Sequence, residues 1–248
     1  MNIAVCVSHV PETTIKVKIG SDGKSIDPFG ITYSINPYDE YAVEEALKTK
    51  AKFGGEVTVI SIGTEANKET IRKTLAMGAD KGILLKDDSS KDSFAIAKAL
   101  TEELKTQNYE IVFFGKQSVD YNNAITGQLT AEFLGFNCVS FVIRLKIENN
   151  KIIAEREIEG GIEVVETELP AIITTQKGLN EPRYASLKGI ISAKKKLIHE
   201  KPALQTENLT EIVKMYKLPE KQPGRILSTD ISAVIELVKL LHEEANVI

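Results

Sequence analysis

The stretch from Gly115 to Gln128 carries side chains suited to binding a phosphorylated ligand. It reads Gly-Lys-Gln-Ser-Val-Asp-Tyr-Asn-Asn-Ala-Ile-Thr-Gly-Gln and lies between an apolar, strand-like segment and a predicted helix. Backbone N–H groups at a helix start attract phosphate, and open α/β sheets bind ligands at the carboxyl ends of their strands. Asn and Thr side chains can also cap a helix, so the pattern fits an ordinary polar strand-to-helix turn equally well.

The tract does not match the common nucleotide-binding motifs. Gly115 and Lys116 lack the spacing of a P-loop, and Gly127-Gln128 lacks the lysine that reaches terminal phosphates. No turn in the sequence carries the Gly-x-Gly-x-x-Gly dinucleotide fingerprint. A nucleotide bound at this tract would therefore be held in a different way.

A second group of candidates is a run of acidic residues on one predicted strand. Glu155, Glu157 and Glu159 alternate with other residues and therefore fall on one strand face. Paired carboxylates can serve acid–base catalysis, but no histidine or nucleophilic serine stands close to them in the sequence. A solvated or partner-facing strand is favoured over a catalytic dyad.

The segment Leu179–Leu187 combines residues that anchor protein interfaces. It offers Arg183, Tyr184 and Leu187 in a polar loop. Aromatic and arginine side chains dominate the binding energy of many interfaces, which favours a docking role. The run Lys194-Lys195-Lys196 that follows is by itself typical of a solvated face.

Other reactive side chains are few. Cys6 and Cys138 both lie in apolar, strand-like runs, which predicts reduced core cysteines rather than a disulfide or a metal pair. His9, His199 and His242 are too dispersed to suggest a metal site. The inventory for catalysis is therefore thin.

The overall composition narrows the class of protein. A net charge of −4 argues against binding nucleic acid in bulk. No apolar run approaches the roughly 20 residues that a membrane helix needs, so we expect a soluble protein without membrane insertion. The chain begins directly with a buried-strand pattern rather than a leader, which predicts a cytoplasmic location.

The elements that must position these residues follow an α/β pattern. The 248 residues, 42% of them hydrophobic, suffice for one large α/β core or a core with a smaller appendage. Up to about residue 135, short apolar runs alternate with amphipathic stretches, which predicts a mostly parallel sheet flanked by helices. The expected strands are 3–8, 57–62, 82–85 and 111–114, and the expected helices are 41–53, 69–77 and 93–107.

After residue 135 the pattern changes to consecutive strands. They are expected at 139–145, 152–158, 162–169 and 171–175, and together they predict an antiparallel extension of the sheet. A polar loop at 175–186, a segment at 187–197, an irregular stretch at 200–224 and an amphipathic helix at 228–244 follow. We expect this tail to pack away from the main core.

Several stretches together resemble the small (beta) subunit of electron-transfer flavoproteins. The signature of that family, a charged stretch around Gly-Gly that leads to proline and aliphatic residues, is matched from Ala154 to Thr174. The resemblance covers essentially the whole chain. Further matching stretches are Val5–Val7 with Val10–Thr13, Ile35–Glu40, Ala76–Asp80, the tract from Gly115, and Leu179–Leu187 with the lysines after it.

The resemblance implies an electron carrier rather than an enzyme. In this family a large (alpha) subunit holds a redox-active FAD, and the small subunit holds a structural AMP. The heterodimer accepts electrons from acyl-CoA-type dehydrogenases, as in fatty acid oxidation, and passes them to a quinone reductase or another acceptor. The implied fold is a Rossmann-like, adenine-nucleotide-binding domain over residues 1–199, with a C-terminal arm and helix over 200–248 packed on the large subunit.

Residue by residue, the resemblance also implies the sites. The loop 175–197 would dock partner dehydrogenases through Leu187 as hydrophobic anchor, with Tyr184 and Arg183 beside it. Glu157 would face the mobile flavin domain and help to orient it. The implied AMP-binding residues are Cys6, Asn36, Pro37, Tyr38, Asp39, Ile62, Gly63, Gly115, Lys116, Gln117, Ser118, Val119, Asp120, Tyr121, Asn122, Asn123, Ala124, Ile125 and Thr126.

The tract departs from the family pattern at two positions. AMP-binding members carry Asn-Gln before the threonine that matches Thr126, whereas this chain has Ala124 and Ile125. Two side-chain donors are therefore missing, although Asn122 and Asn123 lie close by. A bifurcating subgroup holds a second FAD in the small subunit, with a Gly-Asp-Thr version of the tract that this sequence resembles less. AMP is favoured, and the second FAD is the alternative.

Two other classes of function fit the sequence less well. An adenine-nucleotide hydrolase or ligase on a similar sheet would need a Ser-Gly-Gly-x-Asp-Ser type of phosphate loop after the first strand. Residues 8–14 instead read Ser-His-Val-Pro-Glu-Thr-Thr. A plain nucleotide-sensing module would leave the docking loop and the Glu-Gly-Gly signature without a role.

Overall fold

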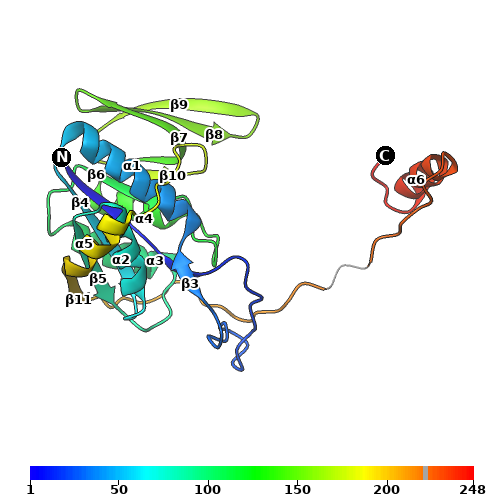
Figure 1. Ribbon diagram of the computed structural model, residues 1–248, viewed down its shortest axis with the longest axis horizontal. Coiled ribbons are helices and arrows are strands. Elements are labelled where there is room, and N and C mark those ends of the chain that lie inside the picture. Colours follow the sequence, from blue (N-terminus) through cyan, green and yellow to red (C-terminus); the bar gives the residue numbers. More distant parts are fainter. Residues whose placement is uncertain (220–222) are drawn as a thin grey trace. The chain divides into compact units, whose positions relative to one another are not determined.

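The computed structural model describes residues 1–219 and 223–248 and contains two compact units (Figure 1). The first unit spans Met1–Val213 and the second spans Lys214–Ile248. Residues 220–222, part of the stretch expected to be irregular, lie outside the described residues. Of the helices that the structure describes, none is both long and apolar enough to cross a membrane.

The first unit is built around a sheet of nine strands. They are β1 (Asn2–Cys6), β4 (Glu56–Gly63), β5 (Lys81–Lys86), β6 (Ile111–Gly115), β7 (Asn137–Glu148), β8 (Lys151–Ile158), β9 (Gly161–Glu168), β10 (Ala171–Thr175) and β11 (Ile198–Pro202). The order is β11-β5-β4-β1-β6-β10-β7-β8-β9. All pairs from β11 to β7 are parallel, and β8 and β9 continue as an antiparallel meander. Two short strands, β2 (His9–Pro11) and β3 (Tyr33–Ile35), form a separate antiparallel ribbon.

Helices cover both faces of this sheet, which confirms the predicted α/β class (Figure 1). They are α1 (Pro37–Phe53), α2 (Asn67–Met77), α3 (Ser93–Leu104), α4 (Thr126–Leu134) and α5 (Leu187–Lys195), while α6 (Ser232–Glu243) belongs to the second unit. Ile3 and Val5 of β1 pack with residues of α1, α2 and α5, whereas Ala4 and Cys6 pack with α3 and α4. Successive residues of a strand point to opposite faces, so strands covered on both faces are apolar throughout.

Helix α1 begins earlier than its apolar spacing indicates. It starts at Pro37, whereas the expected start was residue 41. Proline suits the first helical turn because that turn needs no N–H donor, and Asp39 and Glu40 place negative charge near the positive end of the helix dipole. The apolar positions begin only at Ala42, so the spacing carries no information about this first turn.

The prediction that residues 171–175 belong to an antiparallel extension is wrong. Strand β10 lies between β6 and β7 and is parallel to both, with Ala171 aligned with Ile111 and Asn137. All its residues are buried, which is typical of a central strand covered on both faces. The antiparallel extension is confirmed for β7, β8 and β9.

Strand β11 was not predicted from the sequence. It pairs in parallel with β5 at the edge of the sheet, with His199 aligned with Ile83. Its residues His-Glu-Lys are charged or polar, because an edge strand needs few apolar side chains. The expected domain boundary between residues 199 and 200 falls inside this strand, and the first unit continues to Val213.

One of the two predicted core cysteines is not in the core. Cys6 is buried as expected, but Cys138 is exposed, and both thiols are free. Cys138 lies at the start of β7, next to Val139. Val139 faces the covered side of the sheet, so Cys138 faces the opposite side. The prediction was wrong for Cys138 because the apolar run did not show which of its residues face a helix.

The central position of β10 can be tested by a core truncation. We expect Ile172→Ala to lower the free energy of unfolding by about 2–5 kcal/mol, because this side chain is fully buried. Ile162→Ala in the edge strand β9 is the control, since Ile162 is 55% exposed, and it should cost less than about 1 kcal/mol. Urea unfolding followed by circular dichroism measures both costs. Equal costs would contradict the placement of β10.

Candidate nucleotide site

The predicted site residues meet where the strand order of the sheet reverses. From β1 the chain reaches β4 on one side through α1, whereas β6 pairs with the other side of β1. In open α/β sheets, ligands bind in the crevice outside the carboxyl ends of the strands at such a point. Strands β1, β4 and β6 end there at Cys6, Gly63 and Gly115.

Asp39 of α1 joins the ends of β1 and β6. Its carboxylate accepts hydrogen bonds from the backbone N–H of Ser8 at 2.7 Å, from that of Gly115 at 3.1 Å and from Asn36 Nδ2 at 2.9 Å. Burial raises the pKa of Asp39 to about 7, although these donors favour the charged form. Burial, and then the charge of Asp39, raise the pKa of the Cys6 thiol well above its ordinary value. Cys6 is therefore a neutral packing residue.

Asn36 holds the first half of the polar tract against the start of α1. Its Nδ2 donates to the carbonyl of Gln117 at 2.9 Å, and its Oδ1 accepts from the backbone N–H of Val119 at 3.2 Å. From the neighbouring strand β10, Thr175 Oγ1 donates to the carbonyl of Tyr38 at 3.2 Å. The structure thus brings the predicted segments 36–39 and 115–119 together.

Gly115 is required by the close packing of α1 on the end of β6. A Cβ at this position would stand 2.2 Å from Asp39 Oδ1 and 2.7 Å from the carbonyl carbon of Tyr38. The second atom belongs to the backbone and could move only with the helix. The absence of a side chain therefore permits the approach that brings Asp39 to the Gly115 N–H.

Ile62 and Gly63 end β4 on the other side of β1. Asn67 Nδ2 donates to the carbonyl of Ile62 and to Ser61 Oγ, each at 3.0 Å. Gly63 has a φ of +149°, and a Cβ there would stand 2.4 Å from Asn67 Oδ1. The end of β4 is therefore fixed by the buried side chain of Asn67, which packs against Gly63.

The polar tract opens helix α4 as predicted, but only at Thr126, after a loop over residues 116–125. Asn123 Nδ2 donates to Ser93 Oγ at 3.1 Å and connects this loop to the start of α3. In the first turn of α4, Gln128 Oε1 is buried without a hydrogen-bond partner in the part of the chain that the structure describes. A nucleotide can satisfy such an acceptor, because its amino and hydroxyl groups are donors.

Two residues of the loop have left-handed backbone conformations. The φ angles of Asn122 and Ala124 are 54° and 52°, and Gln117 Nε2 donates to Asn122 Oδ1 at 2.8 Å. For a residue with a Cβ, this conformation costs about 1–2 kcal/mol, and such strain concentrates at ligand-binding sites. Turns of this kind can direct backbone N–H groups toward an anion. The backbone can therefore supply donors where Ala124 and Ile125 supply none.

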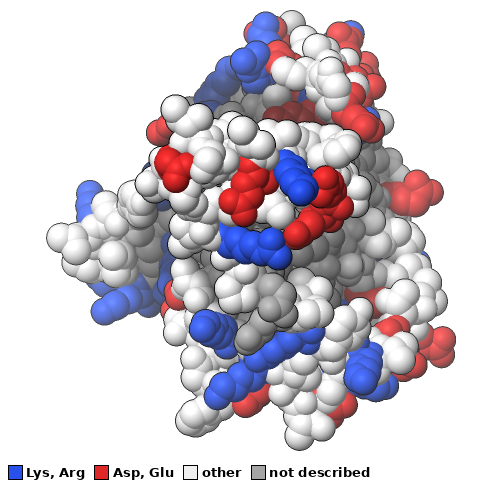
Figure 2. Space-filling view, turned by 90° about the vertical axis from the view of Figure 1, so that its right-hand side faces the viewer, with Lys and Arg blue, Asp and Glu red and all other residues white. Residues whose placement is uncertain are grey.

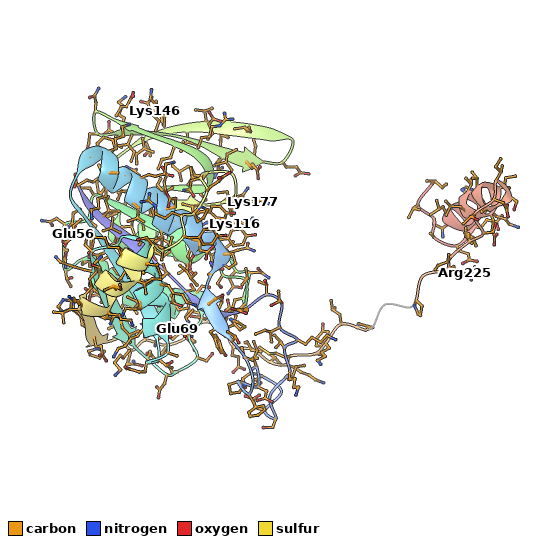
Figure 3. All side chains as sticks on the ribbon, in the orientation of Figure 1. Glu56, Glu69, Lys116, Lys146, Lys177 and Arg225 are labelled. Atoms are coloured by element: carbon orange, nitrogen blue, oxygen red, sulfur yellow. The ribbon has the colours of Figure 1, made fainter. Side chains whose placement is uncertain are left out.

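Two lysines stand at the aligned ends of β6 and β10 (Figure 3). Lys116 directly follows β6, and Lys177 lies two residues beyond β10. Lys116 Nζ lies 4.9 Å from the centroid of the Tyr38 ring and 3.1 Å from Gln176 Oε1. Lys177 was not predicted as a site residue, because only the parallel pairing of β10 with β6 brings it near Lys116.

Glu157 is linked to this edge of the sheet through Gln176. Gln176 Nε2 donates to the Glu157 carboxylate, while its Oε1 accepts from Lys116. Glu155 was expected on the same strand face as Glu157. Its partner is Arg144 at 3.0 Å rather than Gln176. The two carboxylates therefore have separate partners and do not form a pair.

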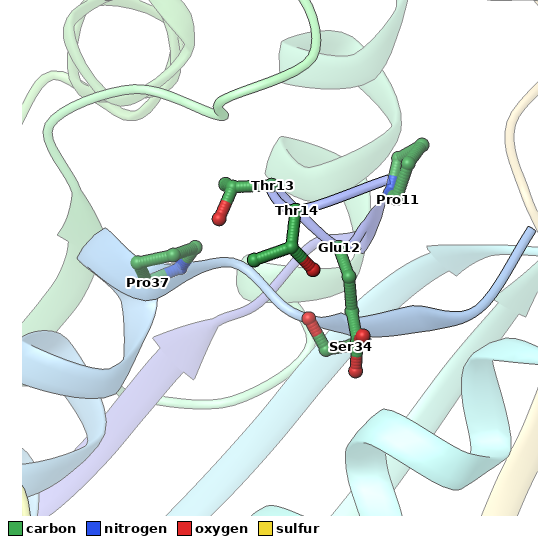
Figure 4. A pocket seen from close by; sticks show the side chains of 6 residues that line it. All are labelled: Pro11, Glu12, Thr13, Thr14, Ser34 and Pro37. Atoms are coloured by element: carbon green, nitrogen blue, oxygen red, sulfur yellow. The ribbon is translucent and has the colours of Figure 1, made fainter. Parts of the chain in front are cut away.

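A shallow hollow of about 170 Å³ lies beside the site, at the start of α1 (Figure 4). It is lined by Pro11, Glu12, Thr13, Thr14, Ser34 and Pro37. Pockets for small molecules usually exceed about 300 Å³. The hollow alone is too small for a nucleotide, so the crevice at the ends of β1 and β6 is the better candidate.

The predicted docking residues lie away from this edge. Tyr184 and Leu187 are 98% and 82% exposed at the start of α5, which packs against α2. Residues of either charge are interspersed on the face of the molecule seen in Figure 2. Within residues 1–219 and 223–248, no three His, Cys, Asp or Glu side chains are grouped so that they could hold a metal ion.

Comparison with known proteins assigns the family. The electron transfer flavoprotein domain matches residues 26–205. The electron transfer flavoprotein subunit beta of Bradyrhizobium diazoefficiens is 39% identical over the full length of both chains. The chain belongs to the electron transfer flavoprotein beta-subunit family. The beta subunit of Bacillus subtilis is 35% identical over both full lengths, and that of Homo sapiens is 34% identical over 98% of this chain and 97% of its own.

Membership in the beta-subunit family assigns a general role. The chain is the small subunit of an electron-transfer flavoprotein, and its partner is an alpha subunit. Flavin takes part in the function of the heterodimer. The residues at the carboxyl edge of the sheet are therefore those of an electron-transfer subunit.

Asp39 should make stability depend on pH. Its carboxyl titrates near pH 4 when unfolded and near 7 when folded, so between these values the folded chain binds more protons. Its stabilising contribution to the free energy of unfolding is greatest below about pH 4. The contribution falls by at most about 1.4 kcal/mol per pH unit up to about pH 7. Urea unfolding from pH 5 to 8 should show this slope in the wild type and not in Asp39→Asn; equal slopes would contradict it.

Proposed function

We propose that this chain is the AMP-binding small subunit of a heterodimeric electron-transfer flavoprotein. The heterodimer carries electrons from acyl-CoA-type dehydrogenases to a quinone reductase or another acceptor, through an FAD held mainly by the large subunit. One observation carries the AMP assignment. Asn36 and Asp39 join the tract from Gly115 to the end of β1, at the point where the strand order reverses.

Two features of the tract support AMP over a second FAD, and two others support an adenine nucleotide in general. Its sequence differs from the Gly-Asp-Thr version of bifurcating members. The left-handed residues Asn122 and Ala124 give the loop a backbone suited to anion binding. Gln128 Oε1, which has no partner among the described residues, suits a donor group of an adenine nucleotide. These two features fit AMP and the AMP half of FAD equally well. A single phosphate needs only this loop and a nearby positive charge, which Lys116 and Lys177 provide.

The chain contributes binding and positioning rather than chemistry. FAD supplies the redox chemistry of the heterodimer. Asp39 and Asn36 hold the nucleotide loop, and Cys6, which burial keeps protonated, offers no nucleophile. These properties support an electron-carrier subunit over a nucleotide hydrolase or ligase.

The second unit supplies a surface for the large subunit. Its helix α6 leaves a set of large apolar side chains exposed. A continuous exposed apolar face of this kind marks an interaction surface. Because β11 belongs to the sheet, the arm that packs on the large subunit is assigned to residues 214–248 within the predicted 200–248. The exposed apolar residues are Val234, Ile235, Leu237 and Val238 of the helix, together with Ile231 directly before it.

The loop 175–197 docks the electron-donating dehydrogenase through Leu187. The support is the exposure of Tyr184, shortly before α5, and of Leu187, the first residue of α5. Glu157 faces the flavin domain of the large subunit and helps to orient it. Its carboxylate is held by Gln176, so its charge has a defined place at the end of β8.

The AMP site can be tested on the heterodimer obtained by co-expression with the large subunit. Acid release and chromatography should find about one AMP and one FAD per heterodimer. Gly115→Ala should lower the AMP content about ten-fold or more, because the new Cβ would meet the backbone of Tyr38. Gly161→Ala is the control, since its Cβ would meet nothing within 4 Å.

The outcomes of that experiment separate the alternatives. Two FAD and no AMP would favour the bifurcating alternative. A stable, colourless monomer that hydrolyses ATP would contradict the proposed function as a whole. Loss of AMP in both glycine variants would contradict the specific role of Gly115.

Leu187→Ala tests docking. The KM for the heterodimer in its reduction by an acyl-CoA dehydrogenase should rise about ten-fold, while the FAD content stays unchanged, because the variant removes an exposed anchor. Phe29→Ala is the control, since Phe29 is 86% exposed outside the loop. Equal kinetics in wild type and Leu187→Ala would remove Leu187 as the anchor.

A further inference from the structure

The docking loop is attached at both ends to helices of its own chain. Near its start, Asn180 Nδ2 donates to Glu45 of α1 at 2.9 Å. At its end, Arg72 of α2 donates to the carbonyl of Lys196 at 2.7 Å. The exposed residues of the loop therefore sit between two fixed points.

The most extensive of these attachments is an ion pair between Arg183 and Glu44. Arg183 Nε and Nη2 donate to the two carboxylate oxygens at 2.7 and 2.8 Å, and the Arg183 backbone N–H donates to Glu44 Oε2 at 3.2 Å. The guanidinium of Arg183 therefore binds the Glu44 carboxylate through two parallel hydrogen bonds. The Glu44 side chain is almost fully buried on α1, whereas that of Arg183 is half exposed. The buried carboxylate is the fixed partner, and the loop is what it holds.

The ion pair lies directly before the side chains that project from the loop. Tyr184 follows Arg183, and Leu187 begins α5, where Ser186 Oγ accepts from the Gly189 N–H at 3.0 Å. Gly189 packs tightly on α2, because a Cβ there would stand 2.3 Å from the carbonyl oxygen of Ala76. The backbone is therefore held before Tyr184 and after Leu187, while both side chains stay exposed.

We propose that Glu44 is a positioning residue for partner docking and that it acts by holding Arg183. This inference rests on the proposed docking function of the loop. Arg183 then acts within its own chain and is not a contact to the dehydrogenase. An anchor that is held in its docking conformation loses less conformational entropy on association. The ion pair thereby strengthens partner binding and leaves the flavin unaffected.

Hydrogen exchange of the AMP- and FAD-containing heterodimer tests the ion pair itself. Glu44→Gln places an amide donor against the guanidinium, and Arg183→Lys keeps the charge at an exposed position but loses the bidentate geometry. Each should speed exchange of the amides between residues 180 and 190 about ten-fold. Glu181→Gln, which removes an exposed carboxylate from the same segment, is the control and should leave exchange unchanged. Unchanged exchange in both ion-pair variants would overturn the proposal.

Kinetics of the same heterodimers test the link to docking. With butyryl-CoA and a butyryl-CoA dehydrogenase as donor, Glu44→Gln and Arg183→Lys should raise the KM for the heterodimer about ten-fold. The maximal rate should stay within about two-fold, and AMP and FAD contents should be retained. Because Glu44 acts through the anchor, combining Glu44→Gln with Leu187→Ala should add little to the effect of Leu187→Ala alone.

The two measurements separate failure of this proposal from failure of the docking function. If Leu187→Ala leaves KM unchanged, the docking function fails, while exchange still decides whether Glu44 holds the loop. If Leu187→Ala raises KM but Glu44→Gln speeds exchange without changing KM, the positioning role of Glu44 is overturned. A raised KM for Arg183→Lys with unchanged exchange would make Arg183 a direct partner contact and would also overturn the proposal.

Discussion

The buried carboxylate of Asp39 is the interaction on which the candidate site depends. It accepts three hydrogen bonds, two of them from backbone groups at the ends of β1 and β6. Burial disfavours its charge and raises its pKa to about 7, and these donors offset part of that effect. Gly115 supplies the space that this arrangement needs. Helix α1 and the two strand ends are thereby held together at the place where a ligand would bind.

Residues of helix α1 hold two loops that lie on different surfaces of the first unit. At its start, Asn36 and Asp39 hold the candidate nucleotide loop, residues 116–125. One turn further along, Glu44 and Glu45 hold the proposed docking loop through Arg183 and Asn180. Residues 116–125 and the part of the docking loop before α5 are irregular segments whose conformation is not determined by local sequence. They depend on the same rigid helix because its buried carboxylates accept hydrogen bonds from residues distant in the sequence.

The distribution of buried and exposed groups suits a subunit that works through a partner. Its most buried thiol, Cys6, is packed in the core, where burial raises its pKa, and Glu155 and Glu157 on β8 have partners within the chain. By contrast, Leu187 and the apolar side chains of α6 are exposed. In a beta subunit of an electron transfer flavoprotein this division has a simple reason, because the flavin of the heterodimer performs the chemistry and the small subunit provides surfaces.

The sequence by itself determined the fold class, the family and the position of the polar tract, since these depend on local periodicity and on contiguous motifs. Only the tertiary structure decided that β10 is a central strand, that β11 extends the sheet and that Lys177 lies near Lys116. It also paired Arg183 with Glu44, 139 residues away. Such long-range pairs follow from which strands and helices become neighbours, and no periodic pattern within one segment records that choice.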